Sequence, residues 1–305
     1  MLVTREEVMT RTAVLVICAL GIAALPLAAD TVAELDRLHE ADRHEQIVSL
    51  VNAQLSAART NADRAALLWR LSRAQLTLAD YGRWKGEMSD SDATELLREA
   101  EANAKRAIDL DSRAAEPRFW KGAAMGLRGQ IRGVLNSLFM ASDVRDYAVE
   151  AIDRNDRYGE AYYLLGQLFR ELPGRPLSFG NRDAAVSLLR KAVDLHEQEY
   201  RDGVVGVRYF DNYTQLADAL WRRNNSADRR RRNHAQAADR YRSASTPLER
   251  GSTFEGSQPL PSGSDREEAV RLVEMVVREL SRVSEPTTRD RKDLESARKL
   301  LSDWR

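Results

Sequence analysis

The sequence predicts an all-α protein built from repeated helical hairpins, and two observations lead to this fold class. Apolar residues recur at spacings of three and four, as in VSLLRKAVDL at 186–195, and no segment alternates with period two for long enough to form a sheet. A pair of helical patterns, the first with a glycine and the second with alanines, also recurs along the chain.

Composition limits the classes of partner. The 305 residues are 43% hydrophobic and 31% charged, which is typical of a folded protein. Lys and Arg number 47, as do Asp and Glu, and this balance argues against a general nucleic-acid surface, which needs a basic excess. The single cysteine, Cys18, lies near the N-terminus, so we expect no disulfide and no cysteine metal site.

The N-terminal segment predicts export. An apolar run follows Arg11 and ends at Pro26 and Ala29, which is typical of a signal peptide over residues 1–29 and of a periplasmic location. The run is short for a membrane span, so a retained N-terminal anchor is the less favoured alternative. The true start, at Met1 or Met9, stays open, as does cleavage of the signal.

The clearest helical hairpin spans residues 159–195. Gly166 on its first helix and Ala185 on its second are small where two helices must touch, and Ala192 leaves room for the next hairpin. Large residues fill the other packing positions at Tyr162, Leu165, Phe169, Leu189 and Leu195. The pattern resembles the 34-residue tetratricopeptide repeat, in which helix A and helix B form one hairpin.

Looser copies of this template fill a repeat domain over residues 30–245, with about five hairpins. In the last of them, we expect Ala237, Tyr241 and Ala244 to lie on helix B. Repeats two to five exceed the template between helix A and helix B by roughly 7 to 16 residues, which predicts enlarged corners. We expect the corner RELPGRPLSFGNRD to fold back over its own repeat with Leu177 and Phe179, and to carry specificity.

The enlarged corners and the predicted export signal give a narrower resemblance over residues 60–245. With YGRWKGE, LRGQIRGVLNSLFMASD and LPGRPLSFGNRD, the chain resembles the periplasmic T-component of TRAP-type solute transporters. It resembles, more distantly, tetratricopeptide proteins of the regulator-of-microtubule-dynamics group. The first resemblance implies a helical accessory protein that works beside a solute-binding protein, with homo-oligomerisation left open.

The composition changes after the repeats. Residues 246–265 are rich in Ser, Gly and Pro and predict a linker that is mobile or laid over the surface. Residues 266–305 carry apolar stripes, with Val273 and Leu280 on one helix and Leu294 and Trp304 on another. We expect this helical pair to cap the array, and a separate partner-binding helix is the alternative.

The sequence offers little chemistry. His39 and His44 are five residues apart, so one helix would point them in different directions, and we expect no metal site. The run Arg229 to Arg232 falls in the predicted last corner, where a solvated loop is the default and contact with anionic lipid or an acidic partner is the alternative. With no nucleophile beside a base, we expect neither an enzyme nor a cofactor.

A partner-binding groove is expected on the concave face, which the A helices line. Aromatic and arginine side chains, the types that dominate binding hot spots, occur among its outward positions. Some of these positions could instead be ordinary surface, or be covered by the corners and the C-terminal helices. The predicted groove residues are Trp69, Arg73, Lys121, Met125, Arg128, Tyr163, Gln167, Arg170, Thr214, Asp218 and Trp221.

The favoured function is therefore an exported scaffold for protein–protein interaction in the cell envelope, accessory to a solute transporter. The alternative is a component that binds or transfers a small apolar ligand in a TRAP-type uptake system. An enzyme is the least favoured class. The expected partners are envelope proteins, including a solute-binding protein, with no nucleic acid, and with membrane contact, if any, only through an uncleaved N-terminus.

Overall fold

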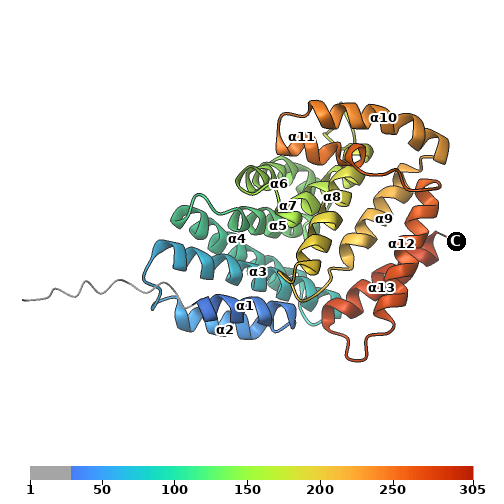
Figure 1. Ribbon diagram of the computed structural model, residues 1–305. Helices are drawn as coiled ribbons and strands as arrows, with labels where there is room; N and C mark the ends of the chain where they lie inside the picture. Colours follow the sequence, from blue (N-terminus) through green and yellow to red (C-terminus); the bar gives the residue numbers. More distant parts are fainter. Residues whose placement is uncertain (1–28, 305) are drawn as a thin grey trace, which may run out of the picture.

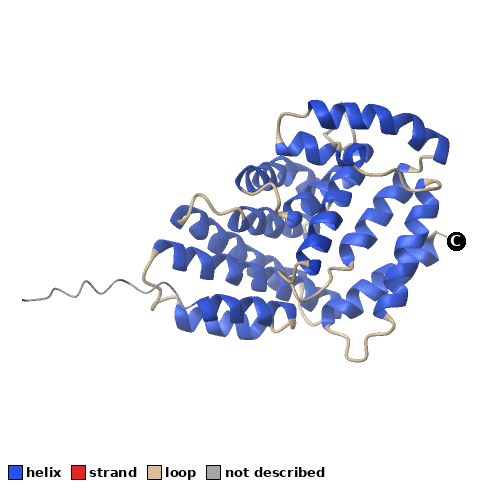
Figure 2. Ribbon diagram, in the orientation of Figure 1, coloured by secondary structure: helices blue, strands red, loops and turns tan. Residues whose placement is uncertain are grey.

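A computed structural model describes residues 29–304, and the chain is all-α over this range (Figure 2). It contains thirteen α-helices and one 3₁₀ turn, and no strand occurs among the described residues, which confirms the predicted fold class. The predicted signal peptide lies outside the described residues apart from Ala29, the first residue of the first helix.

The helices follow one another along the chain, and the longest connection is the corner 172–181. Their bounds are α1 Ala29–Glu40, α2 His44–Gln54, α3 Asn61–Lys85, α4 Asp90–Leu110, α5 Glu116–Ile131, α6 Val134–Arg154, α7 Gly159–Glu171, α8 Arg182–Arg201, α9 Asp211–Arg223, α10 Ala227–Ser243, α11 Pro247–Ser252, η1 Phe254–Ser257, α12 Asp265–Leu280 and α13 Thr288–Asp303.

The first eight helices form four hairpins that stack side by side as a solenoid (Figure 1). The pairs α1 and α2, α3 and α4, α5 and α6, and α7 and α8 each pack against each other, and each pair packs on the next. This arrangement follows from the sequence because one hairpin cannot bury its own apolar faces and must cover them with a neighbour.

The helix boundaries are encoded locally. Thr60 accepts a hydrogen bond from the backbone N–H of Asp63, whose side chain accepts from the Thr60 N–H, a capping box that begins α3. Asn181 caps α8 in a related way by accepting from two backbone N–H groups. Gly86, with φ of 73°, ends α3 in a left-handed conformation that most other residues would resist.

Close packing within the fourth hairpin confirms the role expected for Gly166. A Cβ at this position would lie 2.5 Å from Cγ of Leu189, so α7 and α8 can approach this closely only with glycine there. Ala185 and Ala192 are fully buried on α8, as the tetratricopeptide pattern predicts.

The predicted enlarged corners are wrong for three of the four repeats. The additional residues lengthen the helices instead, so α3 runs on to Lys85, and only Arg132 and Gly133 separate α5 from α6. Three residues separate α9 from α10. No proline interrupts the first two of these segments, and the helices continue to Gly86 and Arg132, which explains their length. Only residues 172–181 form a long corner.

The final hairpin differs from the predicted pairing. We expected Ala237, Tyr241 and Ala244 to place α10 beside α9, but α9 packs instead against α12. The physical reason is the composition of α10, which buries only Arg230 among its seventeen residues and so has no apolar stripe to offer α9. The helix α12 supplies that stripe, with Val273 and Val276 fully buried.

The Ser/Gly/Pro-rich segment is packed rather than extended. It contains α11 and η1, and Phe254 is only 4% exposed. A Cβ on Gly251 would lie 2.5 Å from the ring of Tyr162, so α11 lies directly on the fourth hairpin. Of the two forms expected for this segment, the structure shows the one laid over the surface.

The C-terminal pair caps the array and also returns to its beginning. Arg289 of α13 donates its backbone N–H to Asp42, between α1 and α2, at 2.8 Å, and its guanidinium pairs with the same carboxylate at 3.0 Å. Lys292 pairs with Asp80 of α3, and the N–H of Gly206 donates to Glu40 at 3.0 Å. The last helix and the loop before α9 therefore contact the first repeats.

Candidate functional site

The concave face is expected to carry the binding groove, and its first part holds the repeats together. Arg73 is 7% exposed and donates to Asp36 of α1 at 2.8 Å, while Arg70 donates to the same carboxylate at 3.0 Å. The ring of Trp69 lies 3.9 Å below the Arg70 guanidinium. Burial raises the pKa of Asp36, but the two arginines hold it below its usual value overall. Arg70 and Arg73 thus join α1 to α3, and Trp69 packs against both guanidinium groups.

The middle of the concave face is more accessible. Arg128 is committed to Glu101 of α4, with a hydrogen bond of 3.0 Å, and the Lys121 ammonium lies 4.6 Å from the ring of Tyr147. Met125 of α5 and Gln167 of α7 are half-buried, and among the described residues the side chain of Gln167 makes no hydrogen bond. These two positions are the least committed of the predicted groove.

Internal contacts occupy the last part of the concave face. Most of the predicted groove residues on α7 and α9 take part in them. The hydroxyl of Tyr163 donates to Asp211, Arg170 pairs with Asp218 at 3.2 Å, and Thr214 is 1% exposed. The ring of Trp221 stacks on Trp304 of α13, with centroids 4.4 Å apart and planes 8° from parallel. The C-terminal helices therefore cover this end, one of the alternatives left open above.

Burial of polar groups shifts several pKa values inside the array. Burial and the neighbouring Asp211 charge raise the pKa of Tyr163 and that of Asp293 well above their ordinary values. Burial alone would lower the pKa of His196, but Glu160, 3.5 Å from its Nε2, raises it overall. The end of the array that the C-terminal helices cover is thus a polar interior rather than an open apolar groove.

The two N-terminal histidines correct one expectation. His39 and His44 were expected to point apart on one helix, but their ring centroids are 5.4 Å apart. The helix is interrupted, because α1 ends at Glu40 and α2 begins at His44, and the turn between them brings the rings together. Burial and Arg73 lower the pKa of His39 well below its ordinary value. Within residues 29–304 no group of three or more His, Cys, Asp or Glu side chains is arranged to hold a metal ion.

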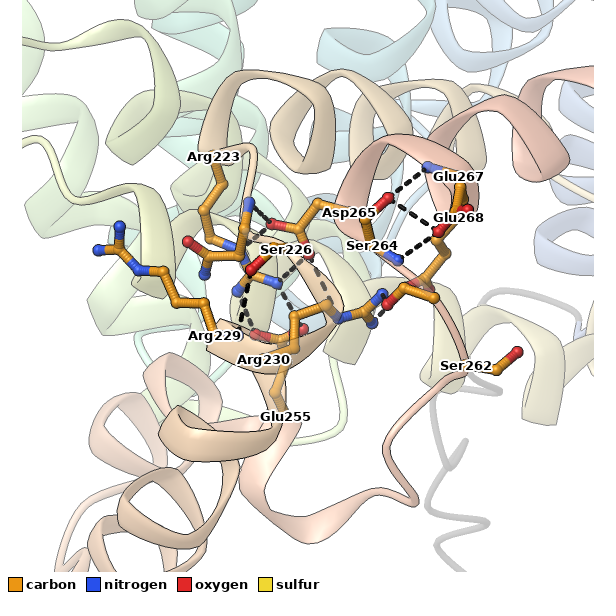
Figure 3. Close-up of polar contacts among 12 residues, drawn as sticks. Arg223, Ser226, Arg229, Arg230, Glu255, Ser262, Ser264, Asp265, Glu267 and Glu268 are labelled. Atoms are coloured by element: carbon orange, nitrogen blue, oxygen red, sulfur yellow. Dashed lines mark hydrogen bonds and ion pairs between the residues drawn. The ribbon is translucent and has the colours of Figure 1, made fainter.

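A second polar cluster lies where α8, α9, α10, η1 and α12 meet (Figure 3). Arg223 pairs with Glu255 and, at 2.8 Å, with Asp265, which is fully buried. Arg230 pairs with Asp265 at 3.3 Å and with Glu268 at 2.5 Å. The third arginine of the cluster, Arg190 on α8, pairs with Glu268 and Glu255.

The cluster changes the interpretation of the arginine run 229–232. It was expected in a solvated loop, but it lies on α10, and Arg230 is 3% exposed. Because the three arginines face three carboxylates, the cluster is neutral and fixes the position of α10. A hollow of about 130 Å³ beside it is lined mostly by polar side chains, including His234 and Asn225. The charged side chains of the cluster form part of its lining, so it is not the predominantly hydrophobic pocket that a small apolar ligand favours.

Sequence reasoning missed a set of exposed apolar side chains at the outer edge. Phe139 near the start of α6 and Leu177 in the 172–181 corner are each 83% exposed, and Leu138 is 38% exposed. As expected, the corner folds back on its own repeat through Phe179, whose ring lies 5.5 Å from that of Phe169. Leu177, expected to fold back with it, points outward. The apolar residues in the two predicted corner segments could have indicated this exposed surface.

Comparisons with known proteins give one family model and a solved structure. A family model described as Regulator of microtubule dynamics protein 1-3 matches residues 31–172, which correspond to α1 through α7. A crystal structure of a thermophilic tetratricopeptide-repeat protein from Thermus thermophilus superposes with a TM-score of 0.47 at 16% sequence identity, over 81% of this chain and 98% of that chain. No curated protein matches the chain.

The family match bears on the resemblances found in the sequence. It agrees with the more distant of the two, the regulator-of-microtubule-dynamics group, and supports a tetratricopeptide-like helical protein. The resemblance to the T-component of TRAP transporters stays a prediction. None of the described helices is both long and apolar enough to cross a membrane.

Proposed function

We propose that this tetratricopeptide-like helical protein is an exported scaffold that holds a protein partner in the periplasm, in association with a solute transporter. The repeat fold supports a role in protein binding, because stacked hairpins present extended surfaces. The apolar run before Ala29 supports export, and the resemblance of the corner segments supports the link to a transporter.

The observation that carries the proposal is the accessible middle of the concave face. Lys121, Met125 and Gln167 lie on the neighbouring A helices α5 and α7 and are half-buried rather than covered. The ends of the array are tied together around them, so the surface is held in one shape before a partner arrives. A preformed surface of this kind lowers the ordering cost of binding.

The size of this window limits the partner segment. Because Arg73 and Thr214, on either side of it, are buried in internal contacts, the window suits a loop or a short peptide rather than a long helix. Met125 offers an adaptable apolar contact, and Gln167 offers an unsatisfied amide donor and acceptor.

Affinity purification from the native envelope tests the proposal. The variant pair Met125→Glu and Gln167→Arg should lose partners that the wild type retains, with an unchanged melting temperature. Gln236→Arg, an exposed position on α10, is the matched control and should retain them. If the paired variant captures the same partners as the wild type, the window is not the binding surface. Cell fractionation tests export, and a cytoplasmic pool alone would contradict it.

A further inference from the structure

The outer edge of the array carries an apolar patch that the scaffold function does not use. The patch consists of Leu138 and Phe139 on α6 and Leu177 in the 172–181 corner. The two segments are neighbours, because the guanidinium of Arg145 on α6 lies 4.8 Å from the ring of Phe179 in that corner. The N–H of Asn181 donates to the Phe169 carbonyl at 3.0 Å, which fixes the base of the corner.

Three arginines lie in or beside the two segments that carry the patch. Arg132, Arg175 and Arg182 are exposed, and within the described residues none of their side chains makes an ion pair. The nearby carboxylates are already paired, Asp146 with Arg145 at 2.8 Å and Glu171 with Arg170 at 2.9 Å. Asp183 lies 3.6 Å from Arg223, and Asp143 is the remaining exposed carboxylate of this edge. The edge therefore combines outward apolar side chains with an excess of free positive charge.

We propose that this edge docks on an anionic membrane surface, with Phe139, Leu177 and Leu138 entering the headgroup region and the three arginines contacting lipid phosphates. Apolar side chains flanked by basic residues are the pattern that binds in a membrane interface. Each inserted Leu or Phe strengthens partitioning by about 10- to 100-fold, and each nearby arginine by about fivefold.

The small size of the patch favours a membrane over a second protein. Three apolar side chains fall well short of the roughly 800 Å² that each partner buries in a stable complex. A bilayer needs no complementary surface, so a few side chains and their charges suffice. This surface was not anticipated from the sequence, which placed membrane contact at the N-terminus or, as an alternative, at the arginine run 229–232.

A fluorescent probe at the patch separates this contact from any effect of the apolar N-terminus. The full chain carrying Cys18→Ser receives an environment-sensitive dye on a cysteine in place of Leu177, or in place of Val204 as the control. Val204 is 71% exposed but lies in the loop before α9. We expect a blue shift at position 177, and none at position 204, on adding vesicles of phosphatidylcholine mixed with phosphatidylglycerol.

Two further measurements, with a charge-reversal variant and with neutral vesicles, test whether anionic lipid is what binds the patch. With Arg175→Glu and Arg182→Glu together, the blue shift at position 177 should need at least tenfold more lipid. The same increase is expected for the wild-type arginines on vesicles of phosphatidylcholine alone. A shift that is equal on neutral vesicles, or equal at positions 177 and 204, would overturn the proposal. A shift that appears without lipid as the protein concentration rises would show that a second copy covers the patch, and would also overturn it.

Discussion

Replacement of Arg289 by alanine tests the contact between the two ends of the array. The Arg289 side chain is 11% exposed and Asp42 is 7% exposed, so the substitution leaves a buried carboxylate without its main counter-charge. Breaking a buried pair in this way costs about 3 to 5 kcal/mol. His44 still lies 3.3 Å from Asp42, and the backbone N–H at position 289 still donates, so we expect the lower end, about 3 kcal/mol.

The measurement is thermal and denaturant unfolding followed by circular dichroism. A loss of about 3 kcal/mol corresponds to a fall in Tm of about 5 °C for a chain of this size. Arg291→Ala is the control, because Arg291 is exposed and bonds only within its own segment. A change of less than about 0.5 kcal/mol for Arg289→Ala, equal to that of the control, would refute the contact.

The same variant has a defined pH dependence. Burial raises the pKa of Asp42, but His44 and Arg289 hold it far below its ordinary value. A lowered aspartate pKa stabilises the folded state above about pH 4, and this stability is lost as the pH falls. The difference between wild type and Arg289→Ala should therefore be largest near neutral pH and should shrink below about pH 4.

Three further predictions concern the packing and the interior charges. Gly166→Ala should destabilise the fold by about 1 to 3 kcal/mol in denaturant unfolding, because the new methyl group would overlap the facing leucine of α8. Trp304→Ala should cost about 2 kcal/mol through loss of the stack on Trp221, and an unchanged unfolding midpoint would mean that α13 does not cap the array. Glu160→Gln should lower Tm more at pH 6 than at pH 9, because a raised His196 pKa stabilises the fold below about pH 6.5 and this is lost as the pH rises.

Local patterns were sufficient to predict the repeat architecture. The spacing of Gly166, Ala185 and Ala192 predicts the hairpin of α7 and α8, because close helix packing requires small residues at these positions. Helix ends were predicted less well. The segments taken for enlarged corners continue as helix to Lys85 and Ile131, because no proline interrupts them and each ends only where a glycine, Gly86 or Gly133, takes a positive φ.

Contacts between distant segments could not be predicted in this way. The composition of α10 shows that it lacks an apolar stripe, but nothing local indicates that α12, which begins about forty residues after α9 ends, takes its place beside α9. The predicted groove residues illustrate the same limit. Thr214 and Trp221 carry groove-like side chains, but whether they meet a partner or α13 depends on how the array curves, which the repeat pattern does not specify.

The central claim is that the array closes on itself, with α13 against the turn between α1 and α2. Disulfide formation between cysteines at positions 42 and 289, in a chain carrying Cys18→Ser, tests this most directly, because the backbone N–H of residue 289 lies 2.8 Å from the Asp42 carboxylate. We expect an intramolecular disulfide in monomeric protein with unchanged helicity. Two free thiols after mild oxidation, or only intermolecular disulfides, would contradict it.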